Sequence, residues 1–155
     1  MAGILGNDSS LTSKAQQLAA AITGDAPQQG NLQEGKQVIA ILLHDFKLRG
    51  LDPKLGITGL LKGVQQGVIK LIKKDNTIMA VQKLSPIAAK VHFFTLDPEP
   101  QFQQIVKGFI DTLRQNGCKV IYDVVADPHN IRAIATAGAH LQPPDMPNMK
   151  FKALL

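Results

Sequence analysis

The sequence predicts a mixed α/β (α+β) fold, in which an antiparallel meander is followed by strand, helix, strand, helix and strand, behind an extended N-terminal arm. The 155 residues are 45% hydrophobic and 19% charged, which suits one globular core and excludes a disordered, collagenous or coiled-coil chain. Short β-rich runs fill the middle of the chain, and amphipathic helical patterns alternate with short apolar runs after it.

The arm spans residues 1–35 and contains one predicted helix. Its small apolar residues recur at helical spacing, at Ala15, Leu18, Ala19 and Ile22. Ser13 and Gln16 fit a capping box, Gly24 fits a helix stop, and residues 24–31 are typical of a linker. Because the apolar stripe is narrow and rich in alanine, the helix is expected to gain its order by docking. The residues assigned to docking on a neighbouring subunit are Ile4, Leu5, Leu11, Leu18 and Ile22.

Residues 36–155 are predicted to form the domain itself. A helix over 36–49 has one hydrophobic face, and a weaker helical pattern follows over 54–66. Glycines recur there at spacings of three or four, at Gly56, Gly59, Gly63 and Gly67. No strand precedes them and no G-K-[ST] ending follows, so close helix packing is favoured over a phosphate-binding loop.

The three meander strands are separated by turn residues and are expected over 68–74, 77–84 and 88–96. An amphipathic helix over 101–115 leads to an apolar strand over 119–125, and this order implies a right-handed crossover between parallel strands. A helix over 128–137 is closed by Gly138. In the last predicted strand, lysines alternate with Met149, Phe151 and Ala153.

Composition limits the compartment and the partners. The single cysteine, Cys118, permits no intrachain disulfide and agrees with a reducing compartment. No apolar stretch reaches the roughly 18 residues of a membrane span and the first residues show no secretory pattern, so a location inside a cell is expected. The formal net charge of +5 permits a nucleic-acid partner. The lysines are scattered and lack interleaved aromatic residues, so a mildly basic solvated surface is favoured.

Residues 36–155 resemble the GNAT superfamily of N-acetyltransferases in their element order and in one motif, VVADPHNIRAIATAGA at 124–139. Family members close with a strand, an Asn, a helix bearing a Tyr, and Gly-Phe. With Gly138 placed on the family glycine, the residues at the Asn, Tyr and Phe positions are Asp127, Ile134 and Ala139. The resemblance therefore implies the fold, while the reactive side chain is absent.

The resemblance also bears on the cofactor. In that family a [Gln/Arg]-x-x-Gly-x-[Gly/Ala] loop presents backbone N–H groups to the diphosphate of acetyl-CoA. Residues 97–104 here read DPEPQFQQ, with no glycine, two prolines and two carboxylates. Because proline has no N–H group and carboxylates repel phosphate, we infer that this site is dismantled and that the chain takes no cofactor. Acetyl-CoA is the alternative.

No other residues form a pattern that carries chemistry, so no catalytic residue is assigned. Asp97 and Glu99 are interpreted as the start of a helix rather than as a general base. Cys118 has no base signature and is expected to be buried, Ser85 lacks the G-x-S-x-G elbow, and Tyr122 is interpreted as a packing residue. No metal is expected, because ligand spacing is absent at His44, His92, His129 and His140.

The predicted function is that of a non-enzymatic, GNAT-like structural protein of a virion or other large assembly. The chain is similar to small GNAT-like components of bacteriophage virions, in its fold, its lost cofactor loop and its retained strand-helix-Gly ending. The expected partners are other protein subunits, such as capsid or internal virion proteins, bound through the arm and a sheet edge, with assembly in the host cytoplasm and no membrane partner. The alternatives are an acetyl-CoA-dependent N-acetyltransferase with a divergent loop, and a basic nucleic-acid-binding accessory protein.

Overall fold

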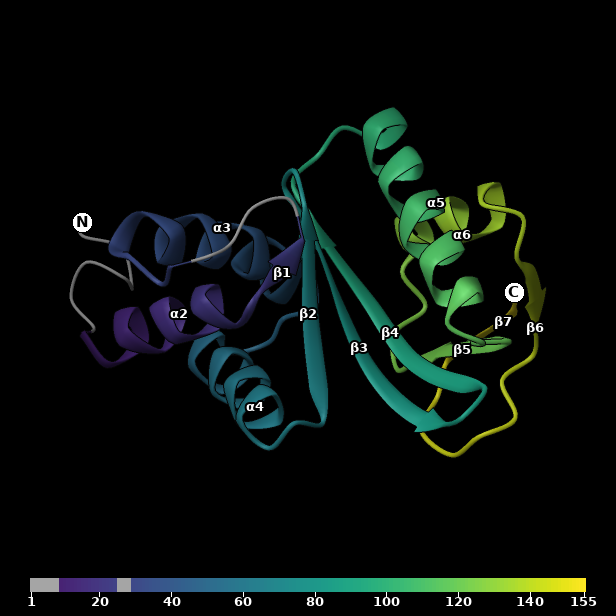
Figure 1. Ribbon diagram of the computed structural model, residues 1–155, viewed down its shortest axis with the longest axis horizontal. Helices are drawn as coiled ribbons and strands as arrows, with labels where there is room; N and C mark the ends of the chain where they lie inside the picture. The colour runs from purple at the N-terminus through teal and green to yellow at the C-terminus, as the bar shows by residue number, and fades with distance from the viewer. Residues whose placement is uncertain (1–8, 25–28) are drawn as a thin grey trace. The chain divides into compact units, whose positions relative to one another are not determined.

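The computed structural model describes residues 9–24 and 29–155, which form a mixed α/β fold (Figure 1). Within these residues, five helices accompany an open, mixed sheet of seven strands in the order β1-β2-β3-β4-β5-β7-β6. The helices are α2 (Ser9–Ala21), α3 (Leu32–Leu48), α4 (Pro53–Gln65), α5 (Glu99–Gln115) and α6 (Pro128–Thr136). The strands are β1 (Thr23–Gly24), β2 (Ile69–Lys74), β3 (Thr77–Ser85), β4 (Ala88–Thr95), β5 (Val120–Asp123), β6 (His140–Gln142) and β7 (Phe151–Leu154). The predicted fold class is confirmed.

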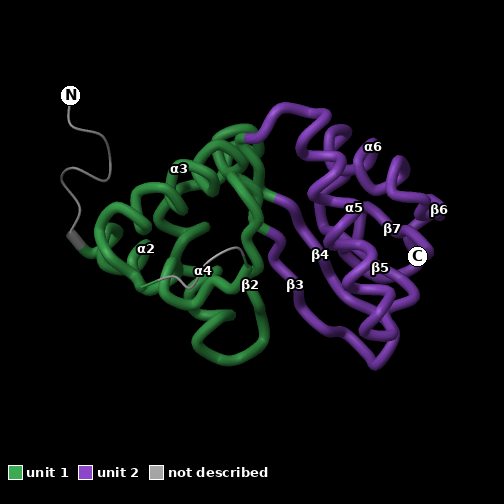
Figure 2. The backbone as a smooth tube through the Cα atoms, turned by 45° about the horizontal axis from the view of Figure 1, so that its top comes forward, with its two compact units in different colours: residues 1–78, 94–96 green, residues 79–93, 97–155 purple. Residues whose placement is uncertain are grey.

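The chain divides into two compact units (Figure 2). The first unit comprises residues 1–78 and 94–96, and the second comprises residues 79–93 and 97–155. The long strands β3 and β4 each contribute residues to both units. This division differs from the predicted boundary after residue 35, because α2 belongs to the same unit as α3 and α4.

In the first unit, α2 packs on both α3 and α4. The predicted docking residues Leu11 and Leu18 of α2, and Ile22 directly after it, are buried, with Leu18 fully inaccessible to solvent. These side chains are therefore covered by their own chain, whereas the sequence suggested a neighbouring subunit. The other two predicted docking residues, Ile4 and Leu5, lie outside the described residues.

The ends of the helices follow from side-chain capping. Asn31 and Glu34 form a capping box at the start of α3. The Glu34 Oε1 atom accepts hydrogen bonds from the backbone N–H groups of Gln29, Gly30 and Asn31. The capping box predicted at Ser13 and Gln16 is wrong, because α2 already begins at Ser9 and both residues lie inside the helix.

Of the four glycines predicted to serve close packing, Gly56 and Gly63 do so, whereas a Cβ atom built at Gly59 or Gly67 meets no described neighbour within 4 Å. A Cβ atom at Gly56 would lie 2.6 Å from a ring carbon of Phe46, and one at Gly63 would overlap the side chain of Ile69. Phe46 also makes an edge-to-face contact with Phe94, with ring centroids 5.8 Å apart. These contacts hold α4 close to α3 and to β2.

In the second unit, β4 and β5 are parallel neighbours joined by α5, which confirms the predicted parallel pair. β5 pairs antiparallel with β7, and β7 pairs antiparallel with β6. Two strands were missed by sequence reasoning, β1 and β6, because they have two and three residues and every residue in them is exposed. A strand needs a buried face to leave an alternating pattern.

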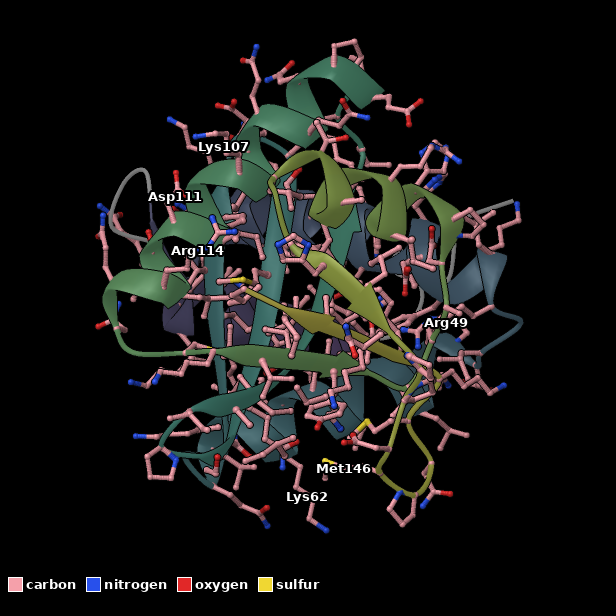
Figure 3. The ribbon with its side chains drawn as sticks, turned by 90° about the vertical axis from the view of Figure 1, so that its right-hand side faces the viewer. Arg49, Lys62, Lys107, Asp111, Arg114 and Met146 are labelled. Atoms are coloured by element: carbon pink, nitrogen blue, oxygen red, sulfur yellow. The ribbon has the colours of Figure 1, made fainter. Side chains whose placement is uncertain are left out.

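Helices α5 and α6 contact each other within the second unit. On the inner side of α5, Phe102 and Phe109 meet Phe93 of β4 at centroid distances of 6.2 and 6.1 Å. Lys107, Asp111 and Arg114 follow one another along α5 (Figure 3). Both terminal nitrogens of Arg114 donate to the carbonyl oxygen of Ala137, which ends α6. The cation thus stabilises the C-terminus of the neighbouring helix.

None of the helices in residues 9–24 and 29–155 combines the length and the apolar character that a membrane crossing requires.

Candidate functional site

The first candidate position is the N-terminus of α5, where the sequence raised the question of an anion site. The N-cap residue is Pro98, and its side chain makes no capping hydrogen bond. Pro98 and Pro100 have no N–H group, and the N–H of Phe102 donates to the carbonyl oxygen of Pro98 at 2.8 Å. The first turn therefore offers few backbone donors to an incoming anion.

A carboxylate of the chain itself occupies this helix end. Glu99 Oε1 lies 2.7 Å from Nε of Arg132 and 3.9 Å from Nδ1 of His129, both on α6. The hydrogen bond from Arg132 lowers the pKa of the Glu99 carboxyl below its usual value. A carboxylate whose pKa is lowered is a weaker base, so this contact favours a structural role over proton abstraction.

The N-terminus of α6 is also closed by the chain's own groups. Asp127 is its N-cap, and its carboxylate accepts from the backbone N–H groups of His129 at 2.8 Å and Asn130 at 3.3 Å. Further along α6, Ile134 is buried, and Ala139 beyond its end is buried as well. Between Asp127 and Gly138, the titratable side chains of this segment are therefore those of His129 and Arg132, and both are exposed.

A second candidate position lies beyond the paired part of β4 and β5. The ladder joins Ala88–Lys90 to Val120–Tyr122, whereas β4 continues to Thr95. Past the end of the ladder, Nδ1 of His92 lies 2.6 Å from Oδ2 of Asp123. Both residues are buried, with 9% and 4% of their surface exposed.

The remaining polar groups around this pair are satisfied within the chain. Asp123 Oδ1 accepts from the N–H of Val125, and the Asp123 carbonyl accepts from the N–H of Lys150. The buried side chain of Asn130 donates from Nδ2 to the carbonyl oxygen of Phe93 at 3.2 Å. Beyond the end of the ladder with β5, a side chain of α6 thus supplies a hydrogen bond to a backbone carbonyl of β4.

An imidazole held by a carboxylate is a known arrangement for proton transfer, because the carboxylate fixes the tautomer of the ring. His92 and Asp123 have this arrangement but are buried among their own chain's groups, which suits a structural pair. Sequence reasoning treated His92 as an ordinary polar histidine. The available signal was that both residues interrupt apolar runs in two strands predicted to be parallel neighbours.

The other sequence candidates remain apart from these positions. His44 and His140 are exposed, and no group of three metal-ligating side chains occurs in residues 9–24 and 29–155. Cys118 is half-buried rather than buried, its Sγ lies 3.4 Å from the Val120 carbonyl oxygen, and burial raises the pKa of its thiol. A raised pKa leaves little of the thiolate that acts as a nucleophile.

Tyr122 does more than pack. Its ring is buried, and its hydroxyl donates to Asp145 Oδ1 at 2.9 Å, while Lys152 Nζ donates to Asp145 Oδ2 at 2.8 Å. Asp145 lies in the exposed connection 143–150, between β6 and β7, as does the labelled Met146 (Figure 3). One carboxylate therefore ties this connection to β5 and β7.

Two kinds of surface could meet a protein partner. The described sheet ends in β1 and β6, which have two and three residues, and Pro143 and Pro144 follow β6. Such edges offer few backbone groups for strand pairing. The second surface is the turn between α3 and α4, where three side chains are exposed: Leu48, Leu51 and Leu55, at 68%, 44% and 75%. We call these three residues the leucine corner.

No protein-family model and no curated protein sequence matches this chain.

Proposed function

We propose that this chain is a non-enzymatic, GNAT-like structural protein of a virion or other large assembly, where it binds neighbouring protein subunits. The order of its elements supports the proposal, since three successive strands are followed by helix, strand, helix and closing strands. Within the motif at 124–139, Asp127 stands where the family has an Asn, and its carboxylate is used to cap α6. Ile134 stands at the Tyr position and is buried.

The observation that carries the proposal is the ion pair between Glu99 and Arg132 at the N-terminus of α5. A family cofactor would place its diphosphate at this helix end. Here the diphosphate would meet two prolines without N–H groups and a carboxylate that is already paired with Arg132. The residues present do not fit acetyl-CoA.

The alternative, a divergent acetyltransferase, needs a base that can take a proton from an amine. The lowered pKa of Glu99 makes it a poor base, and the imidazole of His92 is held by Asp123 in a buried position. Both Glu99 and His92 therefore fit a structural role better than the role of a catalytic base.

Calorimetric titration tests the missing cofactor site. We expect no saturable heat when acetyl-CoA or inorganic diphosphate is added to the wild-type chain at low salt. Glu99→Gln removes the competing carboxylate, so this variant should bind inorganic diphosphate weakly through Arg132 and His129. Asp111→Asn is the matched control, because it removes one exposed carboxylate from the same helix far from its N-terminus. Binding of acetyl-CoA by the wild-type chain at low micromolar concentration would contradict the proposal.

A second measurement addresses the assembly itself. Particles purified from the native source by density gradient should contain the chain at a constant ratio to the major subunit, measured by quantitative mass spectrometry. Salt washing should leave that ratio unchanged if the chain is an integral component. Recovery of the chain only in fractions of free protein would refute a structural role in a particle.

A further inference from the structure

The leucine corner carries an inference that rests on the proposed function and names the surface and the class of partner. We propose that the leucine corner, with the adjoining face of α4, binds an acidic amphipathic segment of a neighbouring protein. Four observations support this: exposed leucines, fixed backbone geometry, a helix glycine without a packing role, and the surrounding charge.

The leucines are exposed in close succession. Leu48 is in the last turn of α3, Leu51 is in the turn, and Leu55 is in the first turns of α4. Single exposed leucines are common on proteins and need no explanation. Three within eight residues, of which two are more than two-thirds exposed, form a small apolar patch of the kind found at interaction sites.

Backbone hydrogen bonds and caps fix the geometry of this corner. Gly50 adopts a left-handed conformation with φ of 69°, and the N–H of Leu51 donates to the carbonyl oxygen of Phe46 at 2.8 Å. Asp52 then caps α4 by accepting from the N–H groups of Lys54 and Leu55. The leucines are thus presented by a preformed turn, which reduces the entropy lost on binding.

Gly59 lies four residues after Leu55 and therefore on the same face of α4. It is exposed, and no described atom beyond its own helix and neighbours lies within 4 Å of a Cβ built there. A glycine inside a helix costs up to about 1 kcal/mol relative to alanine. At Gly56 and Gly63 this cost is accounted for by close packing inside the chain. At Gly59 no such packing is present among the described residues. A bare position beside Leu55 would let the backbone of a partner approach closely.

The charges around this face select the partner. Lys47, Lys54 and Lys62 are exposed, and Lys62 lies three residues beyond Gly59. The carboxylates of the same stretch are already used: Asp45 is buried and bonded to Arg49, and Asp52 caps α4. The apolar patch is therefore bordered by cations, and a partner with acidic residues beside apolar ones would complement it.

Peptide selection on the full chain tests the proposal. A displayed library of randomised amphipathic helical peptides is panned against the wild-type protein, and the retained sequences are read. We expect enrichment of Asp and Glu together with Leu, Ile or Phe. Sequences without acidic enrichment would overturn the proposal.

Matched variants locate the binding site of the selected peptides. Leu51→Gln/Leu55→Gln should weaken binding by roughly tenfold or more, and Gly59→Leu should do the same by filling the bare position. Leu141→Gln, which changes an exposed leucine of β6, is the control and should leave the affinity unchanged. Lys47→Gln/Lys62→Gln should weaken binding more than Lys36→Gln/Lys119→Gln, which removes the same charge elsewhere. Equal binding to the test and control variants would overturn the assignment.

Two other occupants would also overturn it. If sedimentation shows a concentration-dependent dimer that Leu51→Gln/Leu55→Gln abolishes, the corner binds a second copy of this chain. If the wild-type chain binds vesicles of phosphatidylcholine and phosphatidylserine and the variant does not, the corner binds a membrane surface. If no acidic amphipathic peptide binds, only the assignment of the leucine corner is refuted. If the wild-type chain binds acetyl-CoA, the proposed function itself is refuted.

Discussion

Two leucine-bearing regions of the first unit, α2 and the leucine corner, differ in a way that their sequences do not indicate. The narrow apolar stripe of α2 suggested a helix that needs an outside partner, yet Leu11 and Leu18 are buried and the helix packs on α3 and α4. The leucines at the turn between α3 and α4 lie where one predicted helix ends and the next begins, and they are exposed. The exposure of an apolar side chain thus depends on which helices pack together, and the hydrophobic pattern of a single helix does not determine it.

The largest test of this comparison is a pair of leucine truncations. Leu18→Ala should lower the free energy of unfolding by roughly 2–5 kcal/mol, because it leaves a cavity under α3 and α4. Leu55→Ala should change it by less than about 0.5 kcal/mol, since the side chain is 75% exposed. Urea unfolding followed by circular dichroism measures both. Similar losses in the two variants would show that the helices are not packed as described.

A pair of glycine substitutions tests the same contrast within α4. Gly56→Ala should destabilise the protein by roughly 1–3 kcal/mol, because the added methyl group meets the Phe46 ring. Gly59→Ala should stabilise it by up to about 1 kcal/mol, because the site is open and alanine favours the helix. Thermal unfolding distinguishes the two directions. Destabilisation by Gly59→Ala would reveal a packing role for this residue.

Removing the cap of α4 tests how firmly the corner is held. Asp52→Ala deletes the acceptor for the N–H groups of Lys54 and Leu55. It should lower the free energy of unfolding by about 1 kcal/mol. Amide hydrogen exchange should become faster in the first turn of α4 and remain unchanged in α6, whose own cap is Asp127. Uniform acceleration in both helices would mean that the change acts globally.

The smallest effect concerns the second unit, where charge rather than apolar contact holds an exposed segment. The hydrogen bond from Lys152, together with that from Tyr122, lowers the pKa of the Asp145 carboxyl. The stabilisation is therefore present at neutral pH and is lost as the pH falls through the lowered value. The hydrogen bonds to Asp145 raise the pKa values of Lys152 and Tyr122, so their contributions are lost only as strongly alkaline pH is reached.

Asp145→Asn should remove the acidic part of this dependence. Hydrogen exchange across residues 143–150 should be faster in the variant at neutral pH and should approach the wild-type rates, corrected for intrinsic exchange, in acid. Asp111→Asn changes an exposed carboxylate on α5 and serves as the control. If residues 143–150 exchange at the same rate in the wild type and in Asp145→Asn at neutral pH, Asp145 does not hold this connection in place.

Most of the architecture could be predicted because the elements carry regular patterns. The amphipathic repeat of α5, the apolar run of β5 and the turn at Asp75–Asn76 each mark their element, and the order strand, helix, strand gave the parallel pair of β4 and β5. β1 and β6 are exposed and too short to show an alternating pattern.

The contacts between distant residues could not be predicted in the same way. The pair His92 and Asp123 joins positions 31 residues apart, and Glu99 and Arg132 are 33 apart. The acidic character of the turn before α5 was visible in the sequence, but the arginine that holds Glu99 comes from another helix. The burial of α2 depends on two helices that its own sequence does not specify.

The short outer strand β6 has a consequence for behaviour at high concentration. It has three residues, and Pro143 and Pro144 directly after it supply no N–H group for an added strand. An intermolecular sheet growing from this side would have to stop after a few hydrogen bonds. The fold therefore limits strand pairing between copies at this edge of the sheet.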